Sequence, residues 1–227
     1  MNDKKMRVIV TGMHRSGTSA VAGALHHAGL PMGGKFIQPG ADNPKGFFED
    51  AEVLAINKEL LRMNGGSWEK PPAGVTANRE IRDRIRNVLK RTDGLKICGW
   101  KDPRFCFTLP IWTRLMKDRG YEIGVIYVRR AQAAVIESLL KRNGRTEDFW
   151  LGVIRKYQTT FKNFEALGLL RGNKYEIRFA WSFARQPKAG LNRIADWLGE
   201  FGAGLDVDAG AAHVDREMFH HESAKGK

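Results

Sequence analysis

The chain has 227 residues, 42% of them hydrophobic, which suffices for one substantial core and is short for two full domains. Residues 1 to 6 lack the apolar stretch of a secretory signal, and no apolar run approaches the roughly 20 residues of a membrane span, so we expect a soluble, cytoplasmic protein without membrane insertion. The net charge of +13 indicates an anionic partner, which leaves a nucleotide, a nucleic acid, an acidic glycan or a membrane surface open.

The first part of the chain is predicted to form a strand, a glycine loop and a helix. Apolar residues predict a buried strand over residues 6–11, and the spacing of Val21, Leu25 and Ala28 predicts a helix over residues 18–28. Glycine and proline are too frequent in residues 29–48 for regular structure, so we expect a long loop there. Loops of this length inside compact domains usually have a function.

After this loop, predicted strands and helices alternate. The helices are expected over residues 50–63, 78–91, 109–119, 131–142, 147–169 and 189–198, and the strands over residues 95–100, 122–128 and 174–179. This order indicates a three-layer α/β fold with a mostly parallel central sheet flanked by helices, which binds ligands at the carboxyl ends of its strands. We expect a single domain over residues 1–227, with a core over about 6–200 and a weakly structured tail over 206–227.

The loop after the first strand has the spacing of a Walker phosphate loop, Gly12-x-x-x-x-Gly17-Thr18-Ser19. In such loops, backbone N–H groups face an anion at the start of a helix. An NTPase has lysine where this chain has Thr18, and the nearby cation is Arg15, inside the loop. The phosphate loop, residues 12–19, therefore predicts a P-loop-like fold whose anionic ligand is not a triphosphate.

Four segments together resemble the bacterial branch of the family of sulfotransferases that use PAPS (3′-phosphoadenosine 5′-phosphosulfate). The segments are TGMHRSGTS (11–19), DNPKGFFED (42–50), WKDPR (100–104) and the strand and helix from YVRR (127–130) to SL (138–139). The resemblance covers most of residues 6–200. It implies in-line transfer of a sulfuryl group, without a metal, to the hydroxyl or amine of a carbohydrate or other small-molecule acceptor, with adenosine 3′,5′-bisphosphate as product.

The resemblance implies two groups of donor-binding residues. The 5′-phosphosulfate would be held by Arg15, Ser16, Gly17, Thr18 and Ser19. The 3′-phosphate would be held by Arg130, at the end of a strand, and by Ser138, eight positions later on the next helix. Arg129 is one residue out of register. Ala131 and Gln132 stand where the family commonly has Asn-Pro.

Candidate catalytic residues follow from what the transfer requires. Negative charge grows on the leaving phosphate oxygen, and the cations expected to stabilise it are Arg15 and Lys101. The acceptor hydroxyl needs a base, for which Glu49 is the leading candidate, because a Glu here resembles the base position in several branches of the family. Asp102 and His14 are alternatives. The histidine that serves as base in the steroid and phenol branch has no counterpart here, and no zinc-type His/Cys spacing is visible.

Other functions remain open on the sequence. A nucleotide kinase or NTPase on the same fold is disfavoured by Thr18, and a nucleic-acid-binding module is suggested by the charge and the six tryptophans, although no recognition motif supports it. A third alternative binds the donor product without turnover. Residues 29–48 and 64–76 are expected to shape the acceptor pocket. Residues 179–182, FAWS, stand where the family often has Tyr-Glu-Asp-Leu.

Overall fold

The computed structural model describes residues 4–40, 43–170, 174–178, 183–202 and 204–214. Within these ranges, four strands form one sheet in which all paired neighbours are parallel and the spatial order is β2-β1-β3-β4. The strands are β1 (Met6–Thr11), β2 (Ile97–Lys101), β3 (Glu122–Arg129) and β4 (Lys174–Arg178). Residues 179–182 and residues 215–227 of the expected tail lie outside the described ranges.

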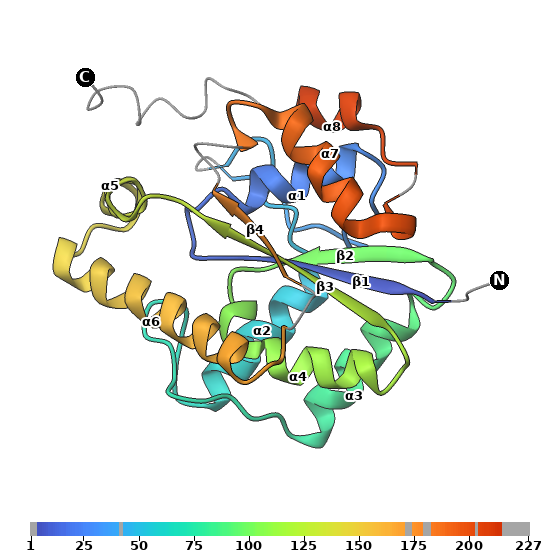
Figure 1. The fold of residues 1–227 in the computed structure, drawn as a ribbon. Helices are drawn as coiled ribbons and strands as arrows, with labels where there is room; N and C mark the ends of the chain where they lie inside the picture. Colours follow the sequence, from blue (N-terminus) through green and yellow to red (C-terminus); the bar gives the residue numbers. More distant parts are fainter. Residues whose placement is uncertain (1–3, 41–42, 171–173, 179–182, 203, 215–227) are drawn as a thin grey trace.

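Helices connect the strands and cover both faces of the sheet (Figure 1). They are α1 (Thr18–His27), α2 (Ala51–Met63), α3 (Arg79–Lys90), α4 (Phe105–Lys117), α5 (Gln132–Asn143), α6 (Glu147–Ala166), α7 (Pro187–Leu198), the 3₁₀ helix η2 (Gly199–Phe201) and α8 (Val207–His213). Of the helices in the described ranges, none combines the length and the apolar composition that crossing a membrane requires. The predicted α/β architecture with a parallel sheet is confirmed.

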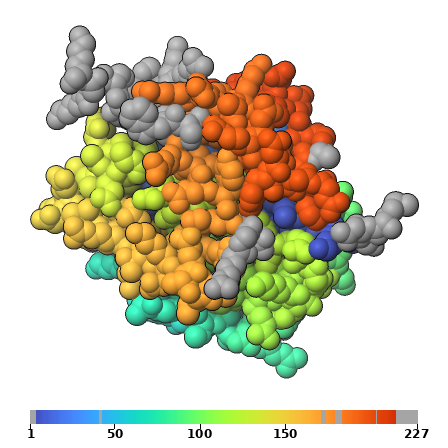
Figure 2. Space-filling view, viewed as in Figure 1, coloured from blue at the N-terminus to red at the C-terminus, as the bar shows by residue number. Residues whose placement is uncertain are grey.

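The central strand β1 contributes to two hydrophobic clusters, because side chains alternate between the faces of a sheet. Val8 and Val10 pack with α1, α7 and α8, whereas Ile9 packs in a second cluster with residues of α2 to α6. Figure 2 shows these helical layers, orange and red above and yellow, green and teal below, closing over the sheet. A strand buried on both faces is mostly apolar, which explains the run of valine and isoleucine in β1. The buried Arg7 of this strand is an exception, and its guanidinium donates hydrogen bonds to Thr92.

The segments that follow β1, β2 and β3 emerge at one edge of the sheet. The register aligns Val10 with Lys101 and Thr11 with Tyr127, so the carboxyl ends of these parallel strands lie together. Strand β1 has β2 on one side and β3 on the other, and the chain passes to them in turn. Open parallel sheets bind ligands at such a reversal of strand order. The phosphate loop follows β1 at this position.

Helix α4 begins four residues before the expected start at Leu109. Asp102 stabilises the early start: its Oδ1 accepts a hydrogen bond from the Arg104 N–H at 2.9 Å, and its carbonyl oxygen accepts one from the Phe105 N–H at 3.2 Å. The helix continues through Pro110, a residue that is unfavourable inside helices because it lacks an N–H group. These contacts therefore outweigh the local preference of the sequence.

The expectation of a weakly structured tail is wrong for its first part, because residues Val207–His213 form α8. Asp206 caps this helix, accepting a hydrogen bond from the Ala209 N–H at 2.9 Å. The helix packs closely on α1, where a Cβ atom on Gly210 would stand 2.6 Å from the Ala24 carbonyl oxygen. So short a helix is marginal by itself, and its packing on α1 stabilises it.

The contact between α1 and α8 brings histidines together. The His213 ring stacks on His27 with 4.3 Å between ring centroids. Burial, followed by the charges of nearby His27 and Lys45, lowers the pKa of His213 to about 4. In the unfolded chain this pKa is about 6.5. Between pH 6.5 and 4 the unfolded state therefore binds more protons, and the free energy of unfolding falls as the pH is lowered through this range.

We expect His213→Gln to reduce the acid sensitivity of the fold. The midpoint of thermal unfolding of the wild-type protein should fall between pH 6.5 and 4, and it should fall less in the variant, because glutamine does not titrate. Circular dichroism melts at half-unit pH steps measure this difference. Ala212→Gln, at an exposed position of α8, is the matched control and should keep the wild-type dependence. Equal slopes in His213→Gln and wild type would contradict the assignment.

Candidate active site

The phosphate loop presents backbone N–H groups at the start of α1. Gly12 has φ +151°, and a Cβ atom there would stand 2.2 Å from the Val128 carbonyl oxygen, so glycine is required. Gly17, the N-cap residue, has φ +95° and no capping side chain, which leaves the first N–H groups of α1 available to an anion. The buried Ser16 hydroxyl donates to the Met13 carbonyl at 2.6 Å, so this side chain shapes the loop instead of lining the cavity.

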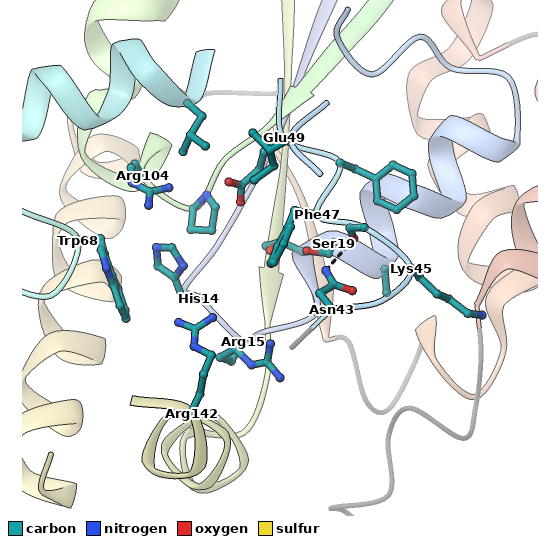
Figure 3. Close-up of a pocket in the computed structure, with 18 of the residues that line it drawn as sticks. His14, Arg15, Ser19, Asn43, Lys45, Phe47, Glu49, Trp68, Arg104 and Arg142 are labelled. Atoms are coloured by element: carbon teal, nitrogen blue, oxygen red, sulfur yellow. Dashed lines mark hydrogen bonds between the residues drawn. The ribbon is translucent and has the colours of Figure 1, made fainter. Parts of the chain in front are cut away.

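A cavity of about 430 Å³ opens where the phosphate loop meets the carboxyl ends of β2 and β3 (Figure 3). Both loops expected to shape an acceptor pocket contribute to it, with Phe47 from residues 29–48 and Trp68 from residues 64–76. The polar and aromatic residues that line it include His14, Arg15, Thr18, Ser19, Asn43, Lys45, Phe47, Glu49, Lys58, Trp68, Arg104, Arg130, Arg142 and His213.

Lys101 and Glu49 form a buried ion pair beside this cavity. Lys101 Nζ lies 2.7 Å from Glu49 Oε1, and the side chains are only 3% and 8% exposed. The ammonium also donates to the Ser19 hydroxyl at 3.0 Å and to the Phe47 carbonyl at 3.2 Å. These three acceptors match its three N–H donors, which is the condition under which a charge tolerates burial. Strand β2 thus brings a positive charge to Ser19, one residue after the Thr18 that replaces the Walker lysine.

The segment before α2 places Glu49 at the cavity. Asp50 caps α2, its Oδ1 accepting hydrogen bonds from the N–H groups of Glu52 and Val53, both at 3.0 Å. Phe48 has a left-handed backbone with φ +53°, which is unfavourable for a residue with a side chain. Its ring is buried and packs against Phe36 with 5.6 Å between ring centroids. This packing stabilises the turn that directs Glu49 toward Lys101.

Arg130 and Ser138 meet the phosphate loop through Arg15. Arg15 Nε donates to Ser138 Oγ on α5 at 2.8 Å, and Arg130 Nη1 donates to the Arg15 carbonyl at 3.3 Å. Arg129 instead pairs with Glu176 of β4 at 3.0 Å. The structure therefore brings the two predicted anion-binding groups into contact. Arg15 and Arg130 line the cavity, whereas Ser138 is buried and does not line it.

Asp102, an alternative candidate base, is completely buried and does not line the cavity. Its Oδ1 accepts from the N–H and Nη1 of Arg104, both at 2.9 Å, and its Oδ2 accepts from Asn57 Nδ2 at 3.0 Å. Asn57 Oδ1 in turn accepts from Thr108 at 2.8 Å and from Trp112 at 2.9 Å. This network holds Arg104 in place and gives Asp102 a structural role.

His14, the other alternative base, does line the cavity. Its Nε2 atom is buried and has no hydrogen-bond partner among the described residues. Burial is the main cause that holds the pKa of His14 well below its usual range, and nearby cations add to it, first Arg104 and then Lys101. His14 is therefore neutral at pH 7 and a weak proton acceptor.

The cavity residues that were not identified from the sequence include Trp68, Arg104 and Arg142. Arg142 follows Ser138 by four positions, so helical spacing alone places both on one face of α5. Arg104 lies in the segment 100–104 that carries the resemblance, but the sequence does not indicate which way its side chain points. Trp68 belongs to a loop, where no periodicity indicates which side chains point inward.

No family model and no curated protein matches the sequence. Among solved structures, a sulfotransferase from Mycobacterium tuberculosis is similar with a TM-score of 0.50 and 14% identity, over 97% of this chain and 72% of that one. A deoxyadenosine kinase from M. mycoides, solved with bound dATP, has a TM-score of 0.42 and 15% identity, over 84% and 98%. At such identity a similarity concerns the fold alone. The fold is P-loop-like, and an activity must be inferred from the site.

We expect Lys101→Met to lower the free energy of unfolding by about 3 to 5 kcal/mol, because the Glu49 carboxylate is left buried without its cation. Adding Glu49→Gln should recover part of this loss, since the double variant buries no unpaired charge. Chemical denaturation followed by circular dichroism measures the three values.

Lys117→Met, at an exposed position of α4, is the control and should stay within about 0.5 kcal/mol of the wild type. If Lys101→Met were as stable as this control, the ion pair would not make the expected contribution to the free energy of unfolding. The same conclusion would follow if the double variant were no more stable than Lys101→Met.

Proposed function

We propose that this protein is a sulfotransferase that uses PAPS as donor. The observation that carries the proposal is the contact between the phosphate loop and the second anion-binding group, in which Arg15 Nε lies 2.8 Å from Ser138 Oγ. PAPS carries a phosphosulfate on the 5′ position and a phosphate on the 3′ position of one ribose. A ligand with two anionic groups so close together needs two adjacent anion sites, which the phosphate loop and the pair Arg130 and Ser138 provide.

Different residues of the site suit the two anionic groups of the donor. The uncapped N-terminus of α1, over Gly17 to Ser19, suits the 5′-phosphosulfate, with Lys101 supplying a cation at Ser19. Arg130 and Ser138 suit the 3′-phosphate, since Arg offers a planar fork of donors and Ser one hydroxyl. Arg15 lies between the two groups, its side chain on Ser138 and its carbonyl on Arg130.

The donor supplies an activated sulfuryl group, and the chain's own residues provide the charges around it. The first N–H groups of α1 stabilise the negative charge on the leaving phosphate oxygen as its bond to sulfur breaks, and Lys101, which does not line the cavity, adds its charge from behind the Ser19 hydroxyl that it binds. Glu49 takes the proton of the acceptor hydroxyl while the new oxygen–sulfur bond forms. Its Oε1 is bound to Lys101, so we assign the proton to Oε2. The acceptor is a carbohydrate or small metabolite with a hydroxyl or amine.

We expect adenosine 3′,5′-bisphosphate to bind the protein and raise its unfolding temperature. Arg130→Ala should weaken this binding by about tenfold or more, because a charge-assisted contact to phosphate is lost, with little effect on the fold. Isothermal titration calorimetry measures the affinity. Arg129→Ala, which removes only the pair with Glu176, is the matched control and should bind like the wild type.

The same titration distinguishes the alternatives. Binding of ATP with magnesium, without binding of the bisphosphate, would overturn the proposal in favour of a kinase or NTPase. Binding of oligonucleotides alone would indicate a nucleic-acid-binding module. Binding of the bisphosphate without transfer to any acceptor would indicate a member that lacks turnover.

We expect Glu49→Gln to lower sulfuryl transfer about 100-fold or more while the affinity for the bisphosphate changes little, because glutamine cannot take the acceptor proton. Transfer of radiolabelled sulfuryl from PAPS to a panel of hexoses, phenols and amines measures the rate. Glu52→Gln, on α2, which affects only the ion pair with Arg84 of α3, is the control. Transfer at the wild-type rate by Glu49→Gln would show that another group is the base.

A further inference from the structure

The cavity carries more positive charge than the proposed donor site uses. Among its described lining residues, six are Arg or Lys and one is a carboxylate, Glu49, which is paired with Lys101. The six cations are Arg15, Lys45, Lys58, Arg104, Arg130 and Arg142. Arg15 and Arg130 belong to the proposed donor site, whereas Arg104 and Arg142 come from the start of α4 and the end of α5.

Arg104 and Arg142 lie at one end of the cavity. Figure 3 shows His14 between them, with Trp68 beside it, on the side away from Ser19. Glu49 lies between His14 and Ser19 in this view, so a molecule bound near His14 approaches Glu49 from the side away from Ser19 and the start of α1.

Both guanidinium groups are held in position by their neighbours. Arg104 donates from Nη1 to Asp102 at 2.9 Å, and since a guanidinium has five N–H donors, one carboxylate does not satisfy it. Arg142 lies with Cζ 5.5 Å from the centre of the Trp68 ring. Trp68 itself stacks on Trp150, with 5.6 Å between centroids and 16° between ring planes. Such rigid donors bind an anion without first losing side-chain freedom.

His14 adds a polar group to this end of the cavity. Its buried Nε2 atom has no hydrogen-bond partner among the described residues, and an unsatisfied buried polar atom is unfavourable in a folded protein. The low pKa of His14, caused first by burial and then by Arg104, is consistent with a site of positive potential that a ligand anion would offset.

We propose that the acceptor carries an anionic group, a phosphate or a carboxylate, which binds between Arg104 and Arg142 and accepts or donates a hydrogen bond at His14 Nε2. The acceptor hydroxyl then lies at Glu49. This inference rests on the proposed sulfotransferase function and names the class of its substrate. Arg104 and Arg142 are specificity-determining residues in this arrangement.

The test uses the full chain saturated with adenosine 3′,5′-bisphosphate, so that the donor site is occupied. Glucose 6-phosphate, glucuronate and glucose are titrated separately, and binding is measured by nuclear magnetic resonance. We expect at least one charged sugar to bind tenfold or more tightly than glucose. The ratio between the phosphate and the carboxylate compound shows which anion the site prefers.

Two variants of α5 connect this binding to the site. Arg142→Gln should lower the affinity for the charged sugar about tenfold and change the affinities for glucose and the bisphosphate less than twofold. Lys141→Gln, whose side chain pairs with Glu137 and does not line the cavity, is the control and should bind like the wild type.

The inference is overturned if glucose binds as well as the charged sugars, if no charged sugar binds, or if Arg142→Gln and Lys141→Gln behave alike. These outcomes leave the proposed function intact as long as the bisphosphate binds. A protein that does not bind the bisphosphate overturns the proposed function, and the inference with it.

Discussion

The buried ion pair between Lys101 and Glu49 is the interaction on which the arrangement of the site depends. It joins the end of β2 to the residue that precedes the cap of α2, and so connects the sheet to the loop 29–48. Because either charge alone would be strongly unfavourable at this depth, the pair stabilises the position of the two segments relative to each other. Phe48, the residue before Glu49, has a left-handed backbone. The packing of its buried ring and the ion pair of Glu49 stabilise this conformation.

Positively charged side chains occur in two different settings in this chain. On the exposed face of α3, Arg79 and Arg86 pair with Asp83, and Arg84 pairs with Glu52, so part of this positive charge is neutralised locally. In the cavity, six cations face one carboxylate among the described lining residues. A focused field of this kind attracts anions far more than scattered surface charges do. The composition alone does not distinguish the two situations.

The fold narrows the function without deciding it, because P-loop-like folds serve enzymes of several classes. The feature that distinguishes this site from an NTPase site is the origin of the cation at the phosphate loop. In a Walker loop it follows the second glycine, whereas here Thr18 takes that position and Lys101 reaches Ser19 from β2. That arrangement, together with Arg130 at the adjacent site, favours a ligand with two closely spaced anionic groups.

The sequence by itself determined the order of strands and helices, the parallel sheet and the position of the phosphate loop, because each of these follows from local spacing of apolar residues and glycines. It failed for α8, whose few residues depend on packing against α1. Only the tertiary structure decided which side chains meet. Lys101 and Ser19 are 82 positions apart, and Arg15 and Ser138 are 123 apart, so no local pattern encodes either contact. Such contacts exist because parallel strands bring distant segments to one edge of the sheet.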